Sequence, residues 1–336
     1  MDEPWKRAKG AFFTLSVPPI AWLLAFFLVP LAIIWAFSFG ENRTLTQIAV
    51  SGTFSNYVHA VQPLYLGIIW TYSFGENKNL VEITVNGTLS NYAHAITPLY
   101  LDIIFKSFWF AAITTFFCLV IGFPVAVAIT FAAEKTKAWL LLLVMLPFWT
   151  NLLIRTYALM AVLRNEGYIN NTLGFLWTAA GHLTALFGHP LGAFQPLPLL
   201  HNNFAVVYGL VYVQLPFMVL PLYAALDRLD RSLLEASLDL GASHFTTFAR
   251  IVVPLAMPGI TSGIIVTLIP SIGAYLTPDL LGGPESMMIA NVIERQFKIA
   301  NNWPFGAALS FLLMYMTFIG IAVQAVIARN RKGEAA

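Results

Sequence analysis

Long apolar segments constrain this chain more than any other feature of its sequence. A window of about 19 residues, read along the 336 residues, finds six segments with few charges. Each is long enough to cross a bilayer as a helix, which takes about 20 residues. They cover residues 17–39, 105–132, 139–163, 204–226, 255–276 and 304–328. The sequence therefore predicts an all-α integral membrane protein with six transmembrane helices and the lipid bilayer as a partner.

Composition excludes several classes of protein. Only 10% of the residues are charged, whereas a soluble globular protein carries about 25%. The net charge of +2 and the lack of a basic cluster argue against nucleic acid as a partner. Cys118 is the only cysteine, so neither an internal disulfide framework nor a thiolate metal site is expected. The histidines show no metal-ligand spacing, and no metal site is predicted.

Basic residues predict the orientation. With the N-terminus inside, eleven basic residues fall on the cytoplasmic side and six on the other side, which favours cytoplasmic tails at 1–16 and 329–336. Arg155 remains inside the predicted third span, where it either snorkels to the outer interface or has a buried role. Prolines inside the spans are typical of a transport pathway, although ordinary kinked packing explains any single one.

A tandem duplication fills the predicted external loop, 40–104. Residues 35–69 recur as 70–104, with 22 of 35 positions identical. At the junction, the apolar stretch 64–74 is too short to span and is expected to be a short strand or an interfacial segment. Either a recent duplication tolerated in a surface loop or a partner-binding adaptation explains the repeat.

The cytoplasmic loop 227–256 is the most informative segment outside the spans. Ser232 and Glu235 fit a capping box, and Gly241 fits the left-handed position that ends a helix. Ser243 is expected to cap a second short helix carrying Phe245. The pattern predicts a helix-turn-helix that presents apolar side chains at the membrane surface and needs a partner groove to cover them.

This loop resembles the EAA motif of binding-protein-dependent ABC importer permeases, written E-A-A, three residues, G, nine residues, I, any residue, L-P. The matching residues are Glu235, Ala236, Ser237, Gly241, Ile251 and Pro254. Ser237 and Val253 depart from the motif by small or apolar changes. The resemblance implies the type I importer permease fold. It also implies that the loop fits a cleft on the ATPase subunit, with Glu235 and Gly241 at that contact.

Four further segments are similar to the spermidine/putrescine branch of that family: LPFWTNLLIRTYAL, LPFMVLPLYAALDRLD, IGAYLTPDLLGG and NWPFGAALS. This resemblance implies a polyamine as substrate, with another small amine or an opine-like solute as the alternative. It implies as partners ATP-binding subunits, a second homologous permease subunit and a periplasmic solute-binding protein. The duplication at 35–104 is not part of the family pattern, so the shape of the binding-protein dock is an open question there.

A cationic substrate needs carboxylates, carbonyls or aromatic faces along its path. Candidates for the path are Asp279, then Glu294, with Tyr275, Trp149 and Tyr157 as aromatic walls. The alternative for Asp279 is that it caps the following turn. No P-loop and no nucleophile elbow occur, so the sequence predicts no catalytic residue and no cofactor, and ATP is hydrolysed by a partner subunit. An ion-coupled secondary transporter and an intramembrane enzyme are the competing classes; the first lacks a carboxylate deep in a span and the second lacks a nucleophile or metal set.

Overall fold

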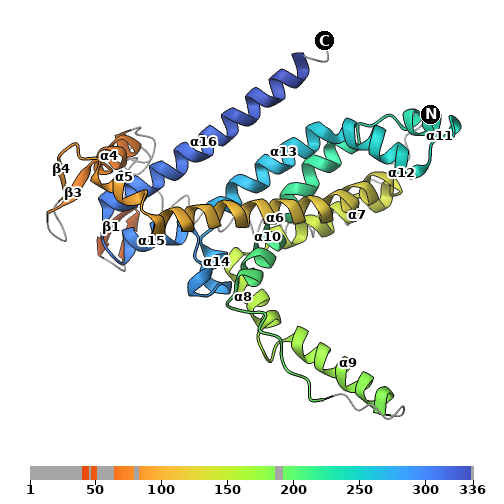
Figure 1. Cartoon of the computed structure of the whole chain (residues 1–336), viewed down its shortest axis with the longest axis horizontal. Coiled ribbons are helices and arrows are strands. Elements are labelled where there is room, and N and C mark those ends of the chain that lie inside the picture. The colour runs from red at the N-terminus through yellow and green to blue at the C-terminus, as the bar shows by residue number, and fades with distance from the viewer. Residues whose placement is uncertain (1–39, 45–46, 51–63, 79–82, 186–191, 334–336) are drawn as a thin grey trace. The chain divides into compact units, whose positions relative to one another are not determined.

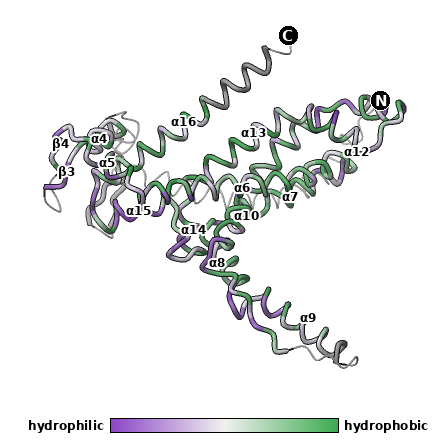
Figure 2. Tube along the Cα trace, viewed as in Figure 1, coloured by the Kyte–Doolittle hydropathy of each residue, from purple (hydrophilic) through white to green (hydrophobic). Residues whose placement is uncertain are grey.

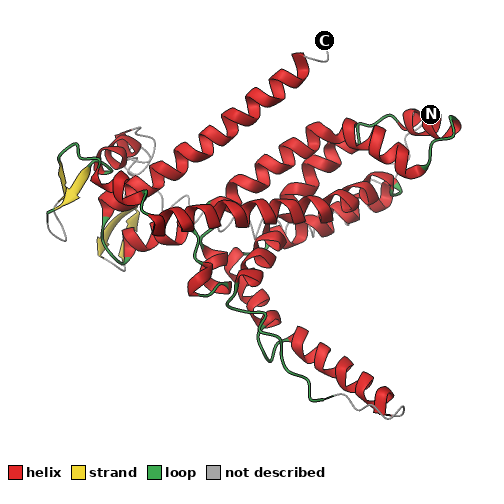
Figure 3. Cartoon of the chain, in the orientation of Figure 1, coloured by secondary structure: helices red, strands yellow, loops and turns green. Residues whose placement is uncertain are grey.

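A computed structural model describes residues 40–44, 47–50, 64–78, 83–185 and 192–333, and helices dominate these residues (Figure 3). The chain divides into two compact units, Met1–Ile69 and Trp70–Ala336. The predicted first span, 17–39, and the N-terminal tail lie outside the described residues.

Four helical segments of the second unit are long and apolar enough to cross a membrane. They confirm the predicted spans at 105–132, 204–226, 255–276 and 304–328, with shifted ends. Their bounds are Pro98–Phe131 (α6), Asn203–Leu226 (α10), His244–Ile272 (ending in α13, Val253–Ile272) and Trp303–Ala322 (the first part of α16, Trp303–Gly333). Hydrophobic residues run along these four segments in Figure 2.

The prediction of one continuous helix over 139–163 is wrong. The chain forms α7 (Glu134–Met145), a 3-10 turn (Leu146–Trp149) and α8 (Leu152–Leu163). It bends by 95° between Glu134–Trp149 and the helical segment Leu152–Gly181 that follows. Pro147 has no backbone N–H to continue the hydrogen bonds of α7. Thr150 is then extended, and the Asn151 side chain caps α8 by accepting from the backbone N of Leu153 at 2.8 Å. Counted as one broken span, this pair raises the total in the described part of the chain to five.

Arg155 follows this break and is only 7% exposed. Its Nη2 donates to the carbonyl of Thr150 at 3.2 Å. The side chain is therefore buried and does not snorkel to the interface, and a functional role for it stays a prediction. After α8, the helix α9 (Tyr168–Ala185) runs away from the other helices of the unit (Figure 1).

Helices α6, α10 and α13 lie side by side and form the core (Figure 1). Glycines allow the close approach: a Cβ at Gly122 would lie 3.2 Å from Cγ of Met218, and one at Gly263 would lie 2.7 Å from its Sδ. Two of the apolar clusters in the described part of the chain lie along these helices. The loop-side cluster, next to the loop 227–256, includes Cys118, Met218, Leu226, Val252 and Ile260, and the α14-side cluster includes Phe110, Val206, Leu210 and Met288.

Both copies of the duplication form the same β-hairpin. In the first copy β1 (Gly40–Thr44) pairs with β2 (Gln47–Val50), and in the second β3 (Gly75–Asn77) pairs with β4 (Ile83–Val85). The partners Gly40↔Val50, Glu41↔Ala49 and Asn42↔Ile48 recur as Gly75↔Val85, Glu76↔Thr84 and Asn77↔Ile83. The register is thus reproduced at the 35-residue period of the repeat.

The junction of the two copies forms a helix, α4 (Leu64–Tyr72), so the strand alternative for 64–74 is wrong. Nine helical residues extend about 14 Å, which is too short to cross a bilayer.

The second copy packs within the second unit, where it contains the short helix α5 (Ser90–Ala95). Trp70 Nε1 donates to the Tyr315 hydroxyl of α16 at 2.9 Å, and the His94 ring lies 4.8 Å from the ring of Phe305. Ala95 is buried in a cluster with Phe305. These contacts join the second copy to α16.

Candidate functional site

The loop 227–256, predicted to face the cytoplasm, forms the first candidate surface. It contains α11 (Arg231–Asp239), α12 (His244–Thr247) and a π-helical turn (Phe248–Val252) that leads into α13. The predicted capping box at Ser232 is wrong: Asp230 is the cap, and its Oδ1 accepts from the backbone N of Ser232 at 3.0 Å. This hydrogen bond from the Ser232 backbone lowers the pKa of Asp230 below its ordinary value. An aspartate takes the cap because it can accept the free N–H groups of the first helical turn.

The turn between α11 and α12 follows the prediction. Gly241 has φ +81°, the left-handed conformation that favours glycine, and Ser243 caps α12 by accepting from the backbone N of Thr246 at 3.2 Å. The hydroxyls of Ser237 and Thr247 lie 2.9 Å apart and link the two helices. Together these contacts fix the angle at which the loop presents its tip.

Apolar side chains project from this loop. Leu240 is 88% exposed and Phe245 is 79% exposed, while Phe248 packs edge-on against Phe123 of α6 at 5.5 Å. Of the other motif residues, Glu235 and Ala236 are exposed on α11, Ile251 is half-buried in the π-helical turn, and Pro254 is exposed at the start of α13. The loop is therefore anchored at its base and apolar at its tip, as expected of a surface that a protein partner covers.

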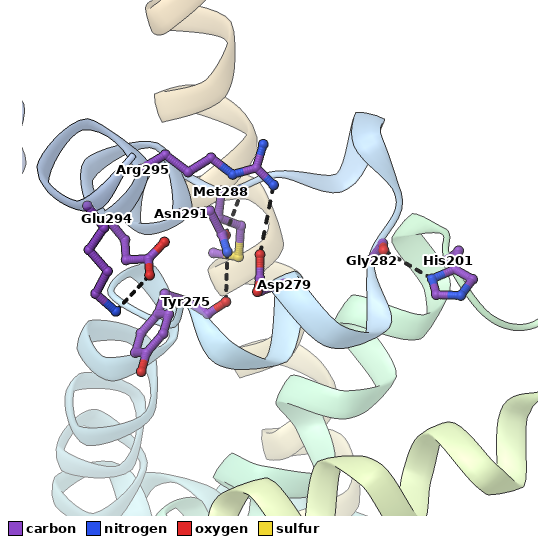
Figure 4. Close-up of polar contacts among 9 residues, drawn as sticks. His201, Tyr275, Asp279, Gly282, Met288, Asn291, Glu294 and Arg295 are labelled. Carbon is purple, nitrogen blue, oxygen red and sulfur yellow. Dashed lines mark hydrogen bonds and ion pairs between the residues drawn. The ribbon is translucent and has the colours of Figure 1, made fainter. Parts of the chain in front are cut away.

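The second candidate lies at the other end of α13, where α14 (Leu276–Leu281) and α15 (Ile289–Lys298) meet (Figure 4). The Asp279 carboxylate lies 3.9 Å from Nη2 of Arg295, with both side chains about half exposed. Glu294 accepts from Lys298 Nζ at 2.9 Å. The hydrogen bond from Lys298 to Glu294 raises the pKa of Lys298, and the charges of Tyr275 and Asp279 raise it further. Both carboxylates predicted for the path are thus paired with basic residues of α15.

Buried polar groups hold this α14–α15 site in place. Asn291 is 2% exposed; its Nδ2 donates to the Tyr275 carbonyl at 2.7 Å, and its Oδ1 accepts from the backbone N of Met288 at 3.2 Å. His201 has φ +60°, and its backbone N donates to the Leu281 carbonyl at 2.9 Å. The loop before α10 and the turn after α14 are thereby tied together.

A cavity of about 280 Å³ opens between these segments. It is lined by His201, Pro278, Asp279, Gly282, Gly283, Pro284, Met287 and Arg295. This volume is near the lower end of the roughly 300–1,000 Å³ typical of small-molecule sites. One anionic and one permanently cationic side chain therefore face a space suited to a small polar solute.

The structure brings together only part of the predicted path. Tyr275, Asp279 and Glu294 share the α14–α15 region, and of these only Asp279 lines the cavity. Trp149 and Tyr157 lie on the broken helix pair, each about half exposed, and do not line it. Asp279 sits in the first turn of α14 and pairs with Arg295, so it does not cap the turn after that helix. Within the described residues, no group of histidine, cysteine and acidic side chains has the geometry of a metal site.

Sequence reasoning missed Arg295, Lys298, Asn291 and His201. The spacing of Glu294 and Lys298 is that of an ion pair on one helix and was a usable signal. Nothing local in the sequence places His201 beside Gly282, where its Nδ1 lies 3.3 Å from the carbonyl oxygen.

Comparison with known proteins identifies the family. A family model described as binding-protein-dependent transport system inner membrane component matches residues 98–333. The chain belongs to this family. This permease is accordingly an inner membrane component of a transport system and not an enzyme, and the resemblance of its loop to the EAA motif is consistent with that membership.

Curated relatives cover nearly the whole permease. It is 41% identical over 319 residues to the spermidine/putrescine transport system permease protein PotB of Haemophilus influenzae, covering 95% of this chain and 94% of that protein. It is 43% identical over 300 residues to PotB of Escherichia coli K12, covering 89% and 91%.

A solved structure supports the fold. The permease matches the crystal structure of a bacterial ABC transporter involved in the import of the acidic polysaccharide alginate, with a TM-score of 0.57 and 15% identity over 97% of this chain and 98% of that one. The permease therefore has the fold of ABC importer membrane subunits.

Proposed function

We propose that this permease forms the translocation path of an ATP-driven importer for polyamines of the spermidine and putrescine class. The observation that carries the substrate class is the identity of 41% and 43%, over most of the chain, to the two permeases named above for spermidine and putrescine transport. The carboxylates of Asp279 and Glu294 at the α14–α15 site, which we propose to be the outer site, can accept hydrogen bonds from a substrate that carries ammonium groups.

The proposed topology has six spans with both termini in the cytoplasm. The span 17–39 and the broken third span complete the four continuous ones, and an even number agrees with the excess of basic residues on the cytoplasmic side. In this topology the loop 227–256 faces the cytoplasm, and the α14–α15 site and the duplication face the periplasm.

The loop 227–256 is the proposed coupling element. Its apolar tip, formed by Leu240 and Phe245, enters a groove of an ATP-binding subunit, and Glu235 and Gly241 contribute to the contact. Ala236, Ser237, Ile251 and Pro254 complete the motif and position the two helices. ATP is hydrolysed in the partner and not in this chain, so movement of the loop transmits the work to α13 through the continuous helical connection at Phe248–Val252.

The outer site is the proposed entrance of the path. A periplasmic binding protein delivers the substrate, and an ammonium group displaces Arg295 from Asp279 or Lys298 from Glu294. Tyr275, in the same region as these carboxylates (Figure 4), is the proposed aromatic wall of the entrance. Trp149 and Tyr157 remain proposed contacts further along the path. The second wall of the path comes from a second, homologous permease subunit.

The test is the ATPase activity of the complex purified through this subunit, reconstituted in liposomes with its binding protein. Spermidine and putrescine are each expected to stimulate hydrolysis and to enter the liposomes, whereas an amino acid and a sugar do neither. A complex without any ATPase subunit would overturn the importer class. An ATPase that responds to another small amine or to an opine-like solute would retain the class and replace the substrate.

A further inference from the structure

A second cavity, of about 440 Å³, opens between the turn that joins α8 to α9 and the segment before α10. It is lined by Arg164, Asn165, Glu166, Pro198, Leu200 and His201. His201 also lines the first cavity, the one beside Asp279. In Figure 4, Gly282 lies between Asp279 and His201, and it accepts from or donates to neither carboxylate. The two cavities are therefore neighbouring parts of one elongated surface.

Buried hydrogen bonds hold the walls of the second cavity in place. Asn170 is 2% exposed, and its Nδ2 donates to the carbonyl of Arg164 at 3.2 Å and to that of Leu197 at 3.0 Å. Its Oδ1 accepts from the backbone N of Leu197 at 2.9 Å. One buried amide thus joins the turn before α9 to the segment before α10. The second cavity is preformed, as small-molecule sites usually are.

Both cavities contain one carboxylate and one guanidinium group. In the first cavity Asp279 lies 3.9 Å from Arg295, and the second cavity has Glu166 and Arg164. Among the residues that the structure describes, no basic side chain forms an ion pair with Glu166. The carboxylate of Glu166 is therefore open to a cationic solute, whereas that of Asp279 must first exchange its partner.

Apolar side chains complete the lining: Pro278, Pro284 and Met287 in the first cavity, and Pro198 and Leu200 in the second. A polyamine is a linear chain in which ammonium groups alternate with short runs of methylene groups. Carboxylates bind the ammonium groups, and apolar side chains pack against the methylene groups. An elongated surface with a carboxylate in each of two neighbouring cavities therefore matches a substrate of this shape.

We propose that the second cavity is an additional ammonium subsite, in which Glu166 binds one ammonium group of a polyamine while Asp279 binds another. The inference rests on the proposed polyamine import and deepens it, because it names a residue that favours the longer substrate. Spermidine is putrescine extended by an aminopropyl group. The additional ammonium group of spermidine occupies the second cavity, whereas putrescine occupies the first cavity alone.

Glu166→Gln tests the subsite, because it removes the charge of an exposed side chain and keeps its shape. The uptake rates of radiolabelled spermidine and putrescine are measured with the reconstituted complex, each substrate delivered by a saturating concentration of loaded binding protein. The ratio of spermidine to putrescine uptake is expected to fall about threefold, as for the loss of one exposed charge contact. Asp279→Asn should leave this ratio unchanged, since both substrates occupy the first cavity.

Glu285→Gln is the matched control, because Glu285 is an exposed carboxylate that lines neither cavity. It should keep the wild-type ratio. The concentration of binding protein that gives half-maximal ATPase stimulation is measured for all variants, and it is expected to stay at the wild-type value in Glu166→Gln.

An unchanged uptake ratio in Glu166→Gln would overturn the subsite. If both uptake rates fell equally and more binding protein were needed for half-maximal stimulation, Glu166 would instead contact the binding protein. Failure of the proposed function is distinguishable, since it appears in the wild-type complex itself as an absence of spermidine and putrescine uptake. That result also overturns the ligand assigned to the second cavity.

Discussion

The two ends of the helical core differ in their exposed side chains: one end presents apolar side chains, and the other presents charged side chains that are paired with one another. At the loop 227–256, Leu240 and Phe245 are largely exposed apolar side chains beside a capped turn. At the opposite end of α13, the charged side chains of α14 and α15 are paired with one another beside a small cavity. A surface that binds a protein partner exposes apolar side chains when the partner is absent. A site that binds a charged solute instead pairs its charged side chains with one another when the solute is absent.

The largest expected effect comes from the loop tip. The double variant Leu240→Asp, Phe245→Asp places two carboxylates where the proposed groove requires apolar contacts. Interface anchors of this kind are worth about 2 kcal/mol or more each. We expect the ATP-binding subunits to be lost from the purified complex, as measured by the ratio of subunits after affinity purification. Leu89→Asp, at an apolar residue that is 64% exposed outside the loop, is the control and should retain them.

A smaller effect is expected at Gly241. Its φ of +81° costs a residue with a side chain about 1–2 kcal/mol. Gly241→Val should therefore misplace α11 relative to α12 and reduce substrate-stimulated ATPase activity about five- to tenfold, with the subunits still associated. Gly320→Val is the control, because a Cβ there meets nothing within 4 Å. Equal activity of both variants would show that the angle between the two short helices does not matter for coupling.

These two ends also differ in how far the sequence predicts them. The loop follows from local signals, since Gly241 and Ser243 act on residues within a few positions. Its one error, the cap at Ser232 in place of Asp230, is a shift of the helix start among residues with similar capping ability. The α14–α15 site depends on pairing between α14 and α15 and on His201, which is distant in sequence. Residue patterns identify Asp279 and Glu294 as candidates but do not identify Arg295 and Lys298 as their ion-pair partners.

The predicted spans also divide into those that local sequence signals identify and one that depends on contacts outside the local pattern. Continuous apolar runs predicted α6, α10, α13 and α16. A hydropathy profile, however, contains no information about the direction of a helix. The stretch 139–163 was therefore predicted as one span, although the chain bends by 95° there. Pro147 was visible as a possible break. The size of the bend depends on Asn151, which starts a new helix at once, and on the buried Arg155, which donates to Thr150 in the break.

At the α14–α15 site, Asp279→Asn removes the charge of the side chain while keeping its shape. Exposed ion pairs contribute at most about 1 kcal/mol, which corresponds to about fivefold in affinity. We expect KM for spermidine uptake to rise by up to about fivefold with little change in the basal ATPase activity. Glu285→Gln, at an exposed carboxylate that does not line the cavity, serves as the control. An unchanged KM in Asp279→Asn would remove this residue from the path.

The smallest effect is expected from deleting the first copy of the duplication, residues 35–69. The deletion joins Ile34 to Trp70 and leaves the whole second copy in place, with its contacts to Tyr315 and Phe305 on α16. Because insertions in surface loops are tolerated at little cost, uptake should stay within about twofold of the wild type. The measurement is spermidine uptake at several concentrations of the binding protein.

A raised requirement for binding protein in the deletion variant would contradict this expectation and would assign the first copy to the periplasmic dock. Trp70→Ala provides the comparison within the second copy, since it removes the hydrogen bond to Tyr315. If Trp70→Ala reduces uptake and the deletion does not, the permease depends on the copy that packs against α16, and the duplication adds length to the loop without adding function.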